Sequence, residues 1–196
     1  MRALQELSRW IDALNERVGR AVYWLVAVAV AVSAANAIVR KLFNMSSNAF
    51  LELQWYLFSA VFLLCAGYTL LRNEHVRIDV VAGRFSPRVQ AWIDVFGTVF
   101  FLMPMALAFV YLSWPVFLRT FEQGEISTNA GGLVLWPARL LVPIGFTLLA
   151  LQGLSELIKR VAFLAGAGPD PIARHDLHAA ERRLAEELRR MAEDKP

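Results

Sequence analysis

Apolar residues gather in four long runs, with neither the alternation of a half-buried strand nor the one-sided stripe of a soluble helix. A helix that crosses about 30 Å of hydrocarbon at a rise of 1.5 Å per residue needs about 20 mostly apolar residues. Each run is long enough and is apolar on all faces, as is typical of burial in lipid or in a bundle. The pattern predicts an all-α membrane protein, a bundle of four transmembrane helices, with spans at about residues 21–39, 49–71, 92–118 and 133–158.

The flanks of these runs support the same borders and suggest an orientation. The indole ring prefers the headgroup zone, and tryptophans stand at or near run ends, at positions 24, 55, 92, 114 and 136. Lys and Arg are concentrated in the N-terminal arm, in the loop after the second run and in the tail. Because cytoplasmic flanks are rich in these residues, we expect both termini to be cytoplasmic.

The first run has an alternative interpretation as a cleaved signal peptide. Small residues at its end, Ser33-Ala34-Ala35-Asn36-Ala37, keep this possibility open. The run is long for a signal sequence, and the arm before it carries acidic residues. An uncleaved span is the favoured interpretation.

Two segments flank the predicted membrane domain, residues 21–160. The arm, residues 1–20, predicts an amphipathic N-terminal interfacial helix, because apolar residues recur at helical spacing at positions 4, 7, 11, 14 and 18. The alternative is a cytosolic extension of the first span. The tail, residues 169–196, changes sharply in composition and predicts a charged cytoplasmic C-terminal helix, which by default is solvated.

Composition and charge exclude several classes of function. Apolar residues make up 57% and charged residues 19% of the chain, and the mean hydropathy is +0.45. The single cysteine, Cys65, excludes a disulfide framework, and the mild basic balance does not suggest nucleic acid. No ionisable residue occurs near the centre of a run, whereas an ion pathway usually needs one. No catalytic motif is present, so we expect no enzyme, no cofactor and no metal.

A few polar residues near the span ends are candidates for structural or partner contacts. Arg139 begins the fourth run, where the helix dipole does not favour a cation, so it should seek an anion. Glu52, in the first turn of the second helix, is the closest candidate by depth, and Glu122 and Glu125 are others. Asp94 lies one turn inside the third run and is expected to pair with an arginine of the middle loop. For each of them a tie within the bundle is the favoured interpretation.

The loop after the second run is the most distinctive stretch: Arg72-Asn73-Glu74-His75-Val76-Arg77-Ile78-Asp79. Apolar residues interleave with charges, as in a segment that lies on the membrane surface or docks on a partner. His75 could titrate near neutral pH. An ordered surface loop is the simpler interpretation.

Three features together resemble the small membrane subunit, DctQ type, of tripartite ATP-independent periplasmic (TRAP) transporters. They are the acidic start of the second span from Glu52 to Phe58, the loop from Arg72 to Asp79, and the stretch from Glu125 to Gly145. Each is weak alone, but their order and spacing are specific, and the resemblance covers roughly residues 18–163. Glu52, His75 and Asp79 match recurring polar positions of that family.

The resemblance implies a small permease subunit in the bacterial inner membrane that braces a large multi-span, sodium-coupled permease subunit. A periplasmic solute-binding protein would deliver an organic acid, and membrane lipids would surround the complex. The alternative from the residues is a self-sufficient homo-oligomeric small transporter or channel, which would need pore-lining polar groups supplied by symmetry. A remoter alternative is a membrane anchor for a cytoplasmic assembly, bound through the tail.

Overall fold

A computed structural model describes residues 2–43, 47–73 and 85–168 of the 196-residue chain. His75, Asp79 and the charged tail therefore lie outside the described residues. The helices are α1 (Arg2–Phe43), α2 (Asn48–Leu71), α4 (Pro87–Gly97), a π-helix η1 (Thr98–Leu102), α5 (Met103–Gln123) and α6 (Trp136–Leu164).

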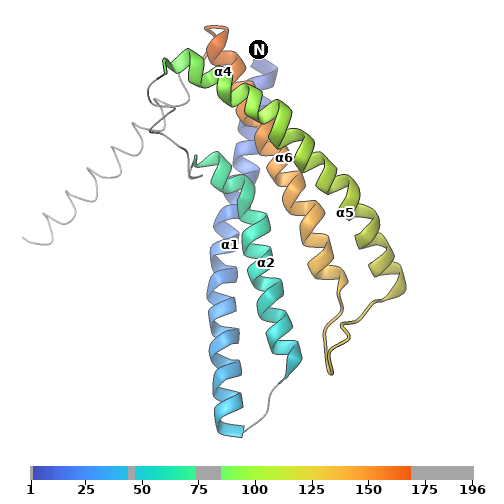
Figure 1. The fold of residues 1–196 in the computed structure, drawn as a ribbon. Helices are drawn as coiled ribbons and strands as arrows, with labels where there is room; N and C mark the ends of the chain where they lie inside the picture. The colour runs from blue at the N-terminus through green and yellow to red at the C-terminus, as the bar shows by residue number, and fades with distance from the viewer. Residues whose placement is uncertain (1, 44–46, 74–84, 169–196) are drawn as a thin grey trace, which may run out of the picture.

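The fold class predicted from the apolar runs is confirmed. Four helices are long and apolar enough to cross a membrane: α1, α2, α6 and the continuous segment formed by α4, η1 and α5. The described residues contain no strand beyond an isolated antiparallel bridge between Ile126 and Val134. Figure 1 shows the N-terminus, α4 and the end of α6 at one end of the molecule, with the α5–α6 connection at the other.

Helix boundaries follow local sequence signals. The dipeptide Ser86-Pro87 is a sequence signal for a helix start, and Ser86 is the N-cap of α4 and Pro87 its first residue, since a proline at this position loses no helical hydrogen bond. The fourth helix begins at Trp136 rather than at the predicted residue 133. The preceding residues pair instead with the start of the α5–α6 loop, where the N–H of Ser127 donates to Leu133 O at 2.9 Å and that of Leu135 to Glu125 O at 3.0 Å.

The arm and the first span form one unbroken helix, the arrangement of the alternative interpretation. The 42 residues of α1 extend for about 63 Å, roughly twice the hydrocarbon thickness. Within the arm, Ser8, Ile11 and Asn15 are buried and continue along one face to Val22. This part of the arm therefore belongs to the bundle, and an interfacial position for the arm stays a prediction.

The helix α6 is the centre of the bundle. Of its most apolar stretch, 44% is buried inside the molecule, against 6–11% for the other three spans. Small and polar side chains fill the interior, while large apolar ones cover the outside. Such an inside is typical of membrane helices, which associate through close packing and hydrogen bonds because lipid already surrounds their apolar faces. The largest fully buried side chains are Gln152, Asn15, Thr120, Pro143 and Ser155.

Candidate functional site: two polar clusters at opposite ends of the bundle

The first polar cluster joins α1 to α6 and is called here the α1–α6 cluster: Ser8, Asp12, Asn15, Gln152, Ser155, Glu156 and Lys159. Asp12 is its hub. Its Oδ1 accepts from Ser155 Oγ at 2.7 Å, Gln152 Nε2 at 3.0 Å and Lys159 Nζ at 2.9 Å. Lys159 also contacts Glu156 at 2.7 Å. Two carboxylates thus share one ammonium, and a fully buried amide and hydroxyl complete the hydrogen bonding.

The fully buried side-chain amide of Asn15 extends this cluster to the place where α1, α2 and α6 cross. Its Nδ2 donates to Gln152 Oε1 at 3.0 Å, and its Oδ1 lies against Gly67 of α2. A Cβ added at Gly67 would stand 2.2 Å from Asn15 Oδ1 and 3.1 Å from the backbone oxygen of Leu148. The absence of a side chain at Gly67 therefore sets how closely the three helices approach.

One turn beyond Asp12 on α1, Glu16 joins the helix to the end of α2. Its carboxylate accepts from Arg72 and, at 3.0 Å, from Arg20. The Arg72 guanidinium lies 5.2 Å from the centroid of the Tyr68 ring, and its Nε donates to Tyr68 Oη at 3.2 Å. The Tyr68 ring in turn fills the space beside Gly19. Helix-to-helix contacts of this kind were not predicted from the sequence.

Asp94 pairs with Arg160 of α6, at 2.9 Å between Oδ2 and Nη1. The side chain of Arg160 is only 6% exposed. We expected a partner in the middle loop, whose Arg77 and Arg84 lie outside the described residues. Sequence spacing could not place Arg160 because the antiparallel packing of α4 against α6 decides which turn faces Asp94.

The second polar cluster fixes the α5–α6 loop on the first turns of α2 and is called here the loop cluster: Glu52, Thr120, Glu125, Ser127, Asn129 and Arg139. Glu52 is 7% exposed, and every contact described for it is an accepted hydrogen bond. Its Oε2 accepts from the N–H of Leu133 at 2.7 Å, and its Oε1 from Asn129 Nδ2 at 2.8 Å and from Ser127 Oγ. Nearby, Tyr56 Oη donates to Val134 O at 3.1 Å.

Arg139 finds its anion in Glu125, at 2.7 Å, and its Nη1 also donates to the hydroxyl of Thr120. The acidic partner that we ranked first by depth, Glu52, is engaged by the loop instead. The reason is that the loop folds over the start of α2 and supplies a backbone N–H, a hydroxyl and an amide to that carboxylate. Glu52, Glu125 and Arg139 make their described contacts within the chain, and whether they also contact a partner stays a prediction.

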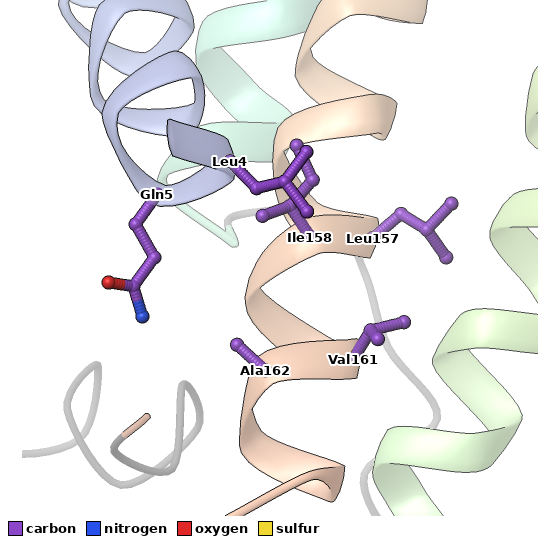
Figure 2. A pocket seen from close by; sticks show the side chains of 6 residues that line it. All are labelled: Leu4, Gln5, Leu157, Ile158, Val161 and Ala162. Carbon is purple, nitrogen blue, oxygen red and sulfur yellow. The ribbon is translucent and has the colours of Figure 1, made fainter. Parts of the chain in front are cut away.

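The described contacts of these groups join helices to one another or to the α5–α6 loop. Among the described residues, no group of three His, Cys, Asp or Glu side chains could hold a metal ion. A shallow apolar groove lies between the start of α1 and the end of α6, where side chains of both helices border an open space (Figure 2). It is lined by Leu4, Gln5, Leu157, Ile158, Val161 and Ala162.

The class defined by this architecture is a multi-pass helical membrane protein with four candidate spans and with its described polar contacts concentrated at the two ends. Residues 29–163 match the model of the family described as "Tripartite ATP-independent periplasmic transporters, DctQ component". The chain belongs to this family, so the resemblance inferred from the sequence is confirmed, and its class is that of a transporter component. No curated protein and no solved structure matches the chain.

Proposed function

We propose that this chain is the scaffold subunit on which a large sodium-coupled permease subunit works during uptake of an organic acid. A periplasmic binding protein would deliver the acid, and both termini of this chain would face the cytoplasm of a bacterium. The family is a component of tripartite transporters, and this supports the presence of a larger permease subunit and a binding protein beside the chain.

The observation that supports this proposal most directly is where the polar groups lie. The central stretches of the four spans, residues 21–39, 53–71, 95–118 and 140–155, carry no Asp, Glu, Lys, Arg or His. Among the charged groups at the two ends, Asp12 and Asp94 are bound to α6, and Arg139 is bound to Glu125 of the loop. Ion-coupled transport usually places ionisable groups or broken-helix carbonyls at mid-depth. A chain that keeps its charges at its ends is suited to bracing a neighbour.

Reconstitution tests the proposal. The purified chain alone in proteoliposomes should take up no organic acid under an inward sodium gradient. The chain together with its large subunit and binding protein should do so. Sodium-driven uptake by the single chain would contradict the scaffold role and would favour the homo-oligomeric transporter. Recovery of only copies of itself, when a tagged chain is purified from its native membrane, would also contradict it.

The orientation has a separate test in cysteine labelling. In a Cys65→Ser background, Glu6→Cys should resist a membrane-impermeant maleimide in intact cells, whereas Thr128→Cys, on the α5–α6 loop, should react. Both positions are exposed on the protein, so access differs by side of the membrane and not by burial. The reverse labelling pattern would invert the proposed topology and leave the scaffold role standing.

A further inference from the structure

The segment α4 is joined to α5 by an irregular stretch of backbone. In η1, the N–H of Met103 bonds to the oxygen of Thr98, five residues back, in place of the usual four. Pro104 follows and has no N–H to donate, so the helical ladder is weakened again one residue later. Sharp changes of helix direction occur at such π-helical turns and prolines.

The packing of this joint on the described residues is one-sided. No residue of η1 is buried, and the rings of Phe100 and Phe101 are 62% and 68% exposed. A Cβ placed on Gly97, just before η1, would meet no atom within 4 Å. On the inner side, Thr98, Leu102 and Met103 lie against Gly153 of α6. Side-chain packing on the described residues therefore resists a change of backbone angle on the inner face of the joint, and not on its outer face.

The two helices on either side of the joint are held to α6 differently. The helix α5 is fastened along its length, because Phe109 stacks on Phe146 with ring centroids 4.4 Å apart and Thr120 is bonded to Arg139. The eleven-residue α4 has a shorter contact, in which Ala91 is buried and Asp94 pairs with the buried Arg160. A buried ion pair holds only while both partners are charged, because removing one leaves the other uncompensated.

We propose that α4 is a latched arm, hinged on α5 at η1 and held on α6 by the Asp94–Arg160 ion pair. When the latch is opened, α4 swings about the joint while α5 keeps its place. The swing carries the exposed apolar side chains of α4, among them Val89, Trp92 and Phe96, across that end of the bundle. The inference is independent of the proposed transport role.

Distances between spin labels, measured by pulsed EPR on the full chain in lipid nanodiscs with Cys65→Ser, test the latch. One label pair, at Arg88 and Leu112, spans the joint. A matched pair, at Leu14 and Ile38, is separated by the same number of residues in the unbroken α1, which spans about 36 Å there. With Asp94 intact both distributions should be narrow. Asp94→Asn should widen the first by about twofold or more and leave the second unchanged.

Two variants locate the effect. Adding Gly97→Ala to Asp94→Asn should narrow the distribution again, because alanine stiffens the helix and meets no neighbour. Asp12→Asn, which removes the carboxylate of another ion pair to α6, should leave the Arg88–Leu112 distribution unchanged. An unchanged distribution in Asp94→Asn overturns the proposal. So does widening that Gly97→Ala does not reverse, or that also affects the α1 pair or appears in Asp12→Asn.

Discussion

Each of the two polar clusters accommodates a carboxylate near one end of the bundle, and the two clusters do so with different contacts. In the α1–α6 cluster, Asp12 is balanced by a cation, Lys159, at 2.8 Å. In the loop cluster, Glu52 is satisfied by a backbone N–H, a hydroxyl and an amide, while the nearby Arg139 is bound to Glu125. The first arrangement neutralises charge, and the second saturates hydrogen bonds.

The difference reflects what each cluster has to hold. Two helices already have their interior backbone N–H groups bonded, so side chains supply the donors that join α1 to α6, as where Ser155 Oγ donates to the backbone oxygen of Ser8 at 3.3 Å. A loop has free backbone donors, and Glu52 uses one of them, the N–H of Leu133, to fix the loop on α2. The α1–α6 cluster therefore sets the spacing of helices, whereas the loop cluster sets the position of a loop.

The largest expected effect is at the crossing of α1, α2 and α6. Gly67→Ala would place a methyl group 2.2 Å from Asn15 Oδ1 and 3.1 Å from the oxygen of Leu148, which is backbone and cannot move aside alone. The variant should lose about 3 kcal/mol of the free energy of unfolding, at the upper end for overpacked sites. Titration with SDS, followed by circular dichroism, measures this loss.

Gly97→Ala is the matched control, because the added methyl group there has no neighbour within 4 Å. It should leave the free energy of unfolding unchanged or raise it by up to about 1 kcal/mol, since alanine is the better helix former. Equal stability of the two variants would show that the crossing is loose, and the α1–α6 cluster would then not set the spacing of helices.

Sequence alone predicts the helices of this protein much better than their contacts. Length and hydropathy located all four spans, and Ser86-Pro87 located the start of α4, because these signals depend on neighbouring residues. The pairing of Asp94 with Arg160 and of Asp12 with Lys159 depends on which turns of distant helices lie level. Hydropathy carries no information on that, since lipid-facing and helix-facing positions are both apolar.

The boundary between the arm and the first span shows a second limit of prediction from the sequence. Composition changes at Arg20, where the uncharged run begins, and this suggested a separate N-terminal helix. The backbone does not change there, because Ser8, Ile11 and Asn15 share one buried face with Val22. The signal was present as small and polar residues at helical spacing, but the outward-facing leucines were the more conspicuous pattern.

A moderate effect is expected when the charge of the α1–α6 cluster is removed. Asp12→Asn keeps an acceptor for Ser155 and Gln152 but loses the ionic contact with Lys159, whose side chain is 28% exposed. The free energy of unfolding should fall by about 1–2 kcal/mol, as for hydrogen bonds to charged groups. Glu6→Gln, in an exposed ion pair with Arg9, should change it by about 0.5 kcal/mol or less. Similar losses in the two variants would contradict the assigned role of Asp12.

Glu52→Gln is expected to change the free energy of unfolding of the whole protein least. Its effect should be concentrated in the α5–α6 loop. The amide keeps one acceptor oxygen, but its NH₂ group faces a donor where the second carboxylate oxygen stood, so the loop loses part of its attachment to α2. The amide protons of Ser127, Leu133 and Leu135 should exchange with deuterium roughly tenfold faster, because the loop opens locally.

Amides of α1 and α6 near Asp12 should exchange as before, since that cluster is held by its own contacts. Glu122→Gln, exposed at the end of α5, should change neither set. Faster exchange at both ends in Glu52→Gln would mean that the two clusters are coupled through α6, and the division between a helix spacer and a loop clamp would fail.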